Sequence, residues 1–206
     1  NEFFNQGKLP EIEVFVDSPL SVNATEIFRM HTDTMNDDVK ETMLNDPDPF
    51  GFNSIHYIKD VEDSKALNFY NKPCIIISSS GMMEAGRIKH HVANNIENPN
   101  NTILIVGYCS PTSLGARIQQ PGLAEISIFG NMHRINARIA KLEGFSAHGD
   151  YKEMIDFLSQ QQDKTKIKKT FLVHGEYRAQ EAFRTHLQEA GFTNIEIPSR
   201  EDSFEL

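Results

Sequence analysis

The sequence predicts an α/β fold in which a mostly parallel sheet is covered by helices on both faces. Short apolar runs rich in β-branched residues alternate along the chain with stretches of helical period. The strand-like runs are apolar throughout instead of alternating with polar residues, as expected where both faces of a sheet are buried. Hydrophobic residues at 39% and charged residues at 24% are typical of a globular domain.

The elements follow one another in a simple order. The strand-like runs cover residues 11–17, 73–78, 102–108, 125–130 and 170–174, with 195–198 as a further candidate. The helix-period stretches cover residues 24–35, 82–96, 151–160 and 177–191. Residues 45–54 are rich in Pro, Gly, Asp and Asn and predict a long surface connection, whereas residues 131–144 have room for one or two strands.

The first ten residues, NEFFNQGKLP, predict the last turn of a helix that ends at Gly7, with Pro10 beyond it. We therefore expect that this chain continues a longer polypeptide. No apolar run approaches the roughly 18 residues that span a membrane, so we expect no membrane partner.

Charge and cysteine content restrict the partners and the compartment. A net charge of −9, from 20 Lys and Arg against 29 Asp and Glu, argues against nucleic-acid binding through a global basic field. It does not exclude an enzyme that meets a phosphate chain in a local cleft. Cys74 and Cys109 lie in or just after strand-like runs, which favours buried thiols in a reducing cytoplasm, and no CxxC spacing offers a thiolate zinc site.

Ligands of open α/β sheets bind where strands end and helices begin. The first such junction, VFVDSPLSVNATEIF, predicts a helix start capped by Asn23 or Ser21. The second, IIISSSGMMEAGR, places Ser80 and Gly81 before a helix N-terminus, where an anion is favoured. Arg87 is expected about one and a half turns into that helix, facing a phosphate or water. Helix capping and phosphate binding stay equal alternatives for this turn.

Two later junctions carry an arginine and a histidine. LIVGYCSPTSLGARI ends a strand in glycine and small polar residues, followed by Arg117, and a plain loop is the alternative. In FLVHGEYRAQ, His174 stands at a strand end beside Gly175, which suits the presentation of an imidazole to a metal or a substrate. A structural histidine is nevertheless the more frequent case.

The heptapeptide GFSAHGD, residues 144–150, places a histidine among small residues just before a helix. Asp150 with Glu153 three residues later predicts a capping box. Ser146 and His148 would then face an anionic substrate, as a hydroxyl donor and a proton donor. Histidine suits the second role because its ordinary pKa is near neutrality.

Five segments in order resemble successive motifs of the β-CASP ribonucleases, a family of the metallo-β-lactamase superfamily that includes the endonuclease of the pre-mRNA cleavage machinery. The segments are DSPLSVNATEIFRMH, SSSGMMEAGRIKHH, NTILIVGY, GFSAHGDY and FLVHGE. The resemblance implies that residues 1–143 form a β-CASP domain and that residues 144–206 re-enter a metallo-β-lactamase domain. It also implies RNA as the substrate, cleaved between the two domains, and leaves room for a homodimer.

The resemblance assigns roles to single residues. His148 matches the histidine that protonates the leaving group, Ser146 the small position at the scissile phosphate, and His174 a zinc ligand associated with RNA-acting members. The turn at Ser80 and Gly81 resembles the family's substrate-side loop, and we group Arg87 and Arg117 with these substrate contacts. In the loop before Arg117, Thr112 and Ser113 stand where relatives have Gly and Thr.

The main metal motif of the superfamily, HxHxDH, is absent from the sequence. None of the eight histidines forms an HxH pair, and the neighbours His90 and His91 are expected to point to different sides of a helix. A hydrolytic zinc ion needs about three protein ligands and an activated water, whereas this chain supplies one ligand by resemblance, His174.

We therefore expect part of a zinc-dependent ribonuclease whose full-length form binds two zinc ions, with this chain lacking the main metal-binding half and inactive alone. Two alternatives stay open: a non-catalytic β-CASP protein that binds RNA or a partner, and an α/β domain that binds a nucleotide or sugar phosphate.

Overall fold

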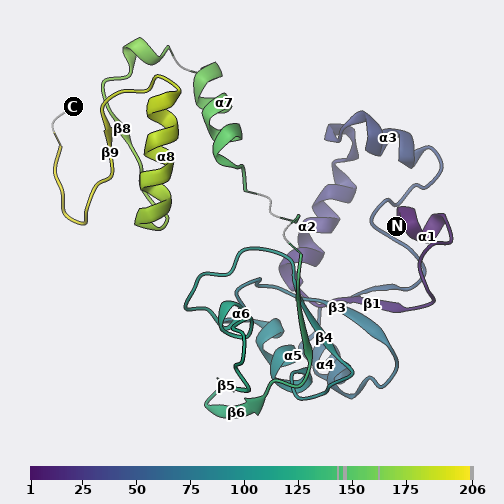
Figure 1. The fold of residues 1–206 in the computed structure, drawn as a ribbon. Helices are drawn as coiled ribbons and strands as arrows, with labels where there is room; N and C mark the ends of the chain where they lie inside the picture. The colour runs from purple at the N-terminus through teal and green to yellow at the C-terminus, as the bar shows by residue number, and fades with distance from the viewer. Residues whose placement is uncertain (143, 146–147, 162, 205–206) are drawn as a thin grey trace. The chain divides into compact units, whose positions relative to one another are not determined.

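The computed structural model describes residues 1–142, 144–145, 148–161 and 163–204. The chain forms two compact units, Asn1–Phe145 and Ser146–Leu206, and each is described by itself (Figure 1). Within the described residues, no helix is both long enough and apolar enough to cross a membrane.

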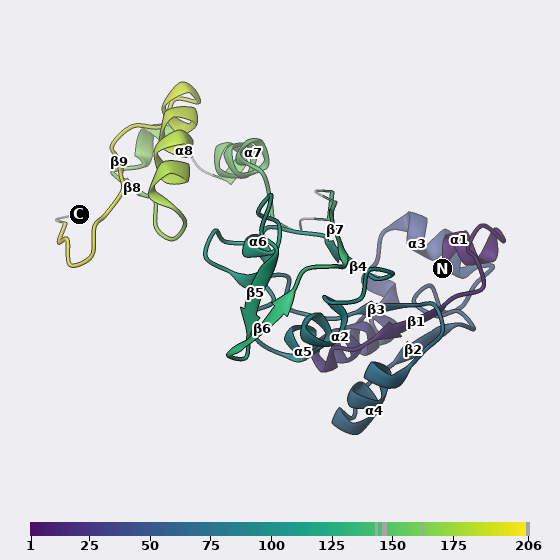
Figure 2. The same ribbon diagram turned by 60° about the horizontal axis from the view of Figure 1, so that its bottom comes forward.

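A parallel sheet forms the first part of the first unit. Strand β1 (Glu13–Val16) lies between β2 (Ile55–Tyr57) and β3 (Cys74–Ile77), with Val14 opposite Ile55 on one side and Ile75 on the other. The central position explains why Val14, Phe15 and Val16 are buried. Figure 2 shows the three strands side by side.

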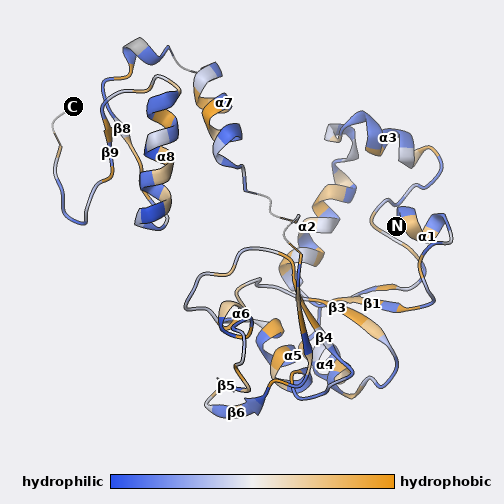
Figure 3. Cartoon of the chain, viewed as in Figure 1, coloured by the Kyte–Doolittle hydropathy of each residue, from blue (hydrophilic) through white to orange (hydrophobic). Residues whose placement is uncertain are grey.

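Helices connect these strands. Helix α1 (Glu2–Asn5) precedes β1, and α2 (Pro19–Met30), a 3₁₀ turn (Thr32–Thr34) and α3 (Asp37–Met43) lie between β1 and β2. Helix α4 (Val61–Ala66) with a 3₁₀ turn (Leu67–Phe69) leads to β3. Helix α3 is mostly hydrophilic (Figure 3) and buries no residue.

The second part of this unit holds its main hydrophobic core. It comprises α5 (Arg87–Asn95), β4 (Thr102–Ile105), α6 (Leu114–Arg117), β5 (Glu125–Ile128), β6 (Asn131–Arg134) and β7 (Arg138–Lys141). Strands β4 and β7 pair in parallel, whereas β5 and β6 form an antiparallel hairpin. The core residues Ile96, Ile105 and Ile128 are at most 2% exposed.

The described residues of the second unit form two α-helices and a short parallel strand pair. Helix α7 (Tyr151–Gln161) and a 3₁₀ turn (Lys164–Lys166) precede β8 (Thr170–Phe171), α8 (Tyr177–Glu189) and β9 (Ile195–Glu196). Leu187 of α8 and Phe192 beyond it are buried, and the Phe171 and Phe204 ring centroids lie 4.9 Å apart.

The predicted α/β class with mostly parallel strands is confirmed, because every described strand pair except the β5–β6 hairpin is parallel. The predicted end of the first helix is confirmed as well. Gly7 has a φ of +64°, its N–H donates to the Phe4 carbonyl, and the Lys8 N–H donates to the Phe3 carbonyl, which together satisfy the last turn of α1.

Two predicted helix starts are wrong. Helix α2 begins at Pro19 instead of residue 24, because Ser18 is the cap and accepts the Ser21 N–H at 3.3 Å, with proline at the first helical position. The caps predicted at Asn23 and Ser21 are therefore both wrong. Helix α5 begins at Arg87 instead of residue 82, since Met83 and Gly86 both have a positive φ and hold residues 80–86 in turns.

Candidate active site

The ends of β1 and β3 meet through serine side chains. The Ser18 and Ser79 hydroxyls are 2.7 Å apart, and the Ser78 hydroxyl donates to the Asp17 carbonyl at 2.8 Å. Ser80 and Gly81, two of the predicted substrate contacts, follow directly in an exposed turn in which the Met83 N–H donates to the Ser80 carbonyl. The first and second strand-end junctions therefore form one edge, as open α/β topology leads one to expect.

The third junction packs against this turn. The Cys109 thiol donates to the Gly81 carbonyl at 3.3 Å, the Gly115 N–H donates to the Met82 carbonyl at 3.0 Å, and the Glu84 carboxylate accepts the Leu114 N–H. A larger residue at position 115 would crowd this contact, because an added Cβ would lie 2.7 Å from the Cys109 sulfur and 3.1 Å from the Gly81 carbonyl oxygen. Three of the four junctions thus come together in the first unit.

The Ser113 side chain, in the third junction, makes internal hydrogen bonds. Its hydroxyl accepts the Ala116 N–H at 3.3 Å as the cap of α6 and donates to the Ser110 carbonyl at 2.7 Å. Arg117, in contrast, is exposed on α6, and its guanidinium has no hydrogen bond or ion pair with any described residue. Of the two predicted arginines, this one is available to a ligand.

The Arg87 guanidinium is held by internal contacts. Its guanidinium donates to the Asp17 carboxylate at 2.6 Å and to the carbonyls of Ile58 and Lys59 at 3.1 and 2.6 Å. Its side chain is 16% exposed. The substrate-binding role of Arg87 stays a prediction.

Asp17 is the centre of a buried polar network that the sequence reading missed. The carboxylate is fully buried and also accepts the Ser64 hydroxyl at 2.6 Å and pairs with His91 Nε2 at 2.5 Å. Burial by itself raises the pKa of Asp17, but the hydrogen bonds from Ser64, His91 and Arg87 outweigh it, so the pKa lies below 3.8. The network joins the end of β1 to α4 and α5. Its sequence signal is the four-residue spacing of Arg87 and His91, which places both on one helix face.

His90 and His91 point to different sides of α5, as expected. His91 is buried, with its Nδ1 atom unpaired among the described residues, whereas His90 is exposed. They therefore do not act together as a metal pair.

In the second unit, the predicted capping box at Asp150 is confirmed. The Asp150 carboxylate accepts the N–H groups of Lys152 and Glu153 at 2.8 and 2.9 Å, and the Glu153 carboxylate accepts the Asp150 N–H at 2.9 Å. His148 lies exposed two residues before this cap. Ser146 lies outside the described residues, so its predicted phosphate contact stays a prediction.

His174 lies in the loop between β8 and α8. Its backbone has a φ of +68°, followed by Gly175 at +109°, so the chain reverses sharply and the side chain is left exposed. Gln180 of α8 holds the loop by donating to the Leu172 carbonyl at 3.1 Å and the His174 carbonyl at 3.4 Å. An exposed imidazole on an anchored turn is a suitable geometry for a metal ligand.

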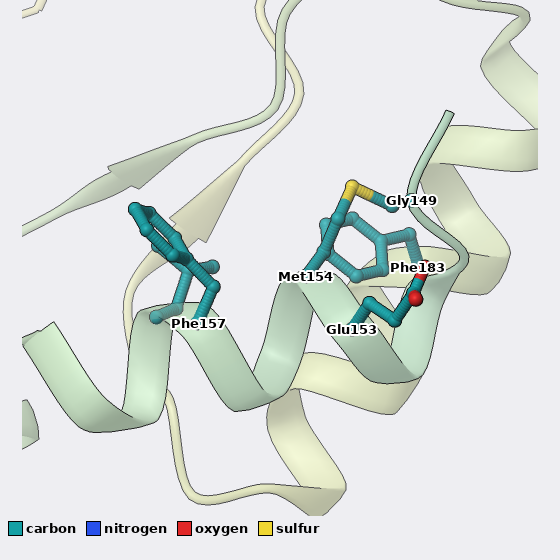
Figure 4. A pocket seen from close by; sticks show the side chains of 6 residues that line it. Gly149, Glu153, Met154, Phe157 and Phe183 are labelled. Carbon is teal, nitrogen blue, oxygen red and sulfur yellow. The ribbon is translucent and has the colours of Figure 1, made fainter. Parts of the chain in front are cut away.

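A cavity of about 370 Å³ lies beside α7 and α8 in this unit (Figure 4). Gly149, Met154, Phe157 and Phe183 line it, and the carboxylate of Glu153, the one ionisable lining group, is held by the helix cap. The cavity is therefore an apolar site and not a metal centre. Among the described residues, no group of three His, Cys, Asp or Glu side chains is arranged to hold a metal ion. The described residues therefore do not provide a complete set of zinc ligands.

Two family models match the chain. The Beta-Casp domain matches residues 1–118, more than half of the sequence. The chain belongs to the β-CASP family. The Zn-dependent metallo-hydrolase RNA specificity domain matches residues 132–198, so the family implies zinc and RNA in general terms.

The similar curated proteins include an RNase J-like protein, a ribonuclease, transcription termination factors and a cleavage and polyadenylation specificity factor. An RNase J-like protein of Methanocaldococcus jannaschii is 31% identical over 176 residues, which are 85% of this chain and 38% of the relative. A ribonuclease of Thermus thermophilus is 30% identical over 82% of this chain and 38% of the relative. The cleavage and polyadenylation specificity factor 73 of Drosophila melanogaster is 25% identical over 91% of this chain and 26% of the relative. The chain thus spans about two fifths, or less, of the length of these relatives.

Proposed function

We propose that this β-CASP chain is part of a zinc-dependent ribonuclease that hydrolyses RNA phosphodiester bonds in the cytoplasm. The observation that carries the proposal is the presence of two exposed histidines, His148 and His174, each beside an anchored structural element. The capping box holds the start of α7 just after His148, and Gln180 holds the turn that carries His174. The Zn-dependent RNA specificity model spans both positions.

In this proposal the two histidines have different tasks. His148 protonates the oxygen that leaves the phosphorus, because it is exposed to solvent and a histidine can carry a proton near neutral pH. Ser146 contributes a hydroxyl to the scissile phosphate. His174 supplies one ligand to a metal site whose other ligands lie outside the described residues. Zinc, when bound, would supply a hydroxide nucleophile.

In this proposal the strand-end edge of the first unit contacts RNA. Ser80 and Gly81 form an exposed turn, and Arg117, which has no partner among the residues that the structure describes, offers its guanidinium to a phosphate. The proposal includes a domain boundary between residues 143 and 144, with the β-CASP domain before it and part of the metallo-β-lactamase domain after it. Possession of both His148 and His174 favours a catalytic protein over one that only binds RNA.

An RNA cleavage assay with the full-length protein tests the proposal. Single-stranded RNA should be hydrolysed in the presence of zinc, and the activity should stop with a chelator and return when zinc is restored. RNA binding without zinc-dependent turnover would instead support the non-catalytic alternative. Binding of free nucleotides or sugar phosphates without any RNA binding would overturn both.

A further inference from the structure

The tip of the β5–β6 hairpin carries an aromatic residue that the turn itself disfavours. Ile128 pairs with Asn131, so Phe129 and Gly130 form a two-residue turn, and their φ angles of 53° and 83° are both positive. Such a turn favours Asn-Gly or Gly-Gly. A bulky residue in the left-handed region is a rare outlier with a backbone penalty. The turn conformation therefore does not account for a phenylalanine at position 129.

Burial does not explain Phe129 either, because 51% of it is exposed. Its ring centroid lies 4.5 Å from that of His90, and Lys89 Nζ lies 5.0 Å from the ring. Both partners are in the first turn of α5, beside the hairpin (Figure 2). An exposed cation–π contact stabilises by less than a left-handed aromatic residue costs. Phe129, Lys89 and His90 are called the Phe129 cluster below.

Lys89 brings a positive charge to the Phe129 cluster, although the whole chain carries −9. Helix α5 contains no acidic residue. On the hairpin, Glu125 faces Arg134 at 3.5 Å, and beyond α5 Glu97 faces His133 at 3.1 Å. Within the described part of the chain, Lys89 and His90 have no carboxylate partner. An exposed ring beside unpaired nitrogen donors fits an aromatic, anionic ligand.

We propose that the Phe129 cluster is a contact site for single-stranded RNA, in which a base stacks on Phe129 while Lys89 and His90 donate to the adjoining phosphate. Stacking on an exposed aromatic ring beside cations is a general way to hold single strands without sequence preference. The inference rests on the proposed function for its ligand class. Helix α5, which carries Lys89 and His90, begins six residues after Gly81 in the same unit.

A binding measurement that needs no turnover tests this site. The full-length protein is titrated against a fluorescent, nuclease-resistant phosphorothioate single-stranded RNA, and the anisotropy gives Kd. Phe129→Asn should weaken binding roughly 5- to 100-fold, the loss expected for one stacked base. Phe129→Tyr should bind as the wild type does. Because Asn-Gly is the preferred pair for this turn, Phe129→Asn should unfold at no lower urea concentration than the wild type.

The matched control is Phe69→Asn. Phe69 is 87% exposed in the same unit, and it has no ring or cation partner among the described residues. This variant should keep the wild-type Kd. If Phe129→Asn and Phe69→Asn bind RNA equally well, or if the wild type does not bind single-stranded RNA, the inference is overturned.

The salt dependence of Kd distinguishes the phosphate contact of Lys89 from the stacking of a base on Phe129. Lys89→Gln should reduce the slope of log Kd against log salt concentration by about 0.7, the value for one phosphate contact to a single strand. Phe129→Asn should leave the slope unchanged. If Phe129→Asn instead abolishes self-association in sedimentation experiments without affecting RNA binding, a second copy of the chain is the occupant and the inference is wrong. RNA binding through Phe129 without any zinc-dependent cleavage would contradict the proposed function alone.

Discussion

Removal of the Asp17 charge should destabilise the first unit strongly. In Asp17→Asn the side chain keeps its shape, but an amide nitrogen replaces one of two oxygens that both accept hydrogen bonds. Arg87, with a side chain only 16% exposed, then loses its carboxylate. Leaving one partner of a buried ion pair uncompensated costs about 3–5 kcal/mol. We expect about 3 kcal/mol, the lower end, because Arg87 keeps its bonds to the carbonyls of Ile58 and Lys59.

Thiol labelling can measure this loss in the first unit alone. Both cysteines of the chain, Cys74 and Cys109, lie in that unit. Both are half-buried, so the rise in labelling above that of the folded protein, measured with a brief pulse of a thiol reagent along a urea titration, reports how much of the first unit is open. The expected cost corresponds to a roughly hundredfold larger unfolding constant.

Glu26→Gln is the matched control for Asp17→Asn. The Lys59–Glu26 pair has the same 2.6 Å separation as the Arg87–Asp17 pair, but its side chains are 57% and 48% exposed. Removing an exposed pair costs about 0–1 kcal/mol. If Asp17→Asn unfolds at the same urea concentration as Glu26→Gln, burial of the network does not govern its energy and the reasoning is refuted.

Two further predictions concern the same unit. The Asp17 pKa is lowered by folding, so its contribution to the unfolding free energy is present above the ordinary aspartate pKa and is lost as the pH falls through the lowered pKa. The free energy of unfolding, measured from urea titrations at a series of acid pH values, should therefore depend less on pH in Asp17→Asn than in Glu26→Gln. Gly115→Ala should destabilise the unit by about 1–3 kcal/mol, because its Cβ would meet the Cys109 sulfur and the Gly81 carbonyl oxygen. Gly107→Ala, which has open space around its Cβ, is the control, and equal urea midpoints would contradict the steric account.

Local sequence signals predicted the local parts of the structure. The capping box at Asp150 and the reversal at Gly7 depend on residues within a few positions of each other, and both are present. The predicted apolar runs contain strands that are shorter than the runs, whereas β2 (Ile55–Tyr57) was not predicted. Helix α2 was placed too late because Ser18, the true cap, was read as part of a turn.

Contacts between distant residues could not be read from the sequence. Asp17 lies 70 and 74 positions from Arg87 and His91, so their network depends on the pairing of β1 with β3 and the docking of α5. For this reason the sequence did not show that the Arg87 guanidinium pairs with the buried Asp17 carboxylate. The packing of the Cys109 loop on the turn at Gly81 is likewise tertiary. The sequence identifies His148 and His174 as candidate site residues, but their catalytic and metal-binding roles stay predictions.

In the proposed function, His148 protonates the leaving oxygen, whereas His174 supplies a ligand to the metal ion. RNA cleavage rate and zinc content should be measured in the same preparations of the full-length wild type, His148→Ala and His174→Ala. We predict that His148→Ala loses cleavage and keeps the wild-type zinc content, whereas His174→Ala loses cleavage together with zinc. Undiminished cleavage by His148→Ala, or unchanged zinc in His174→Ala, would contradict the account.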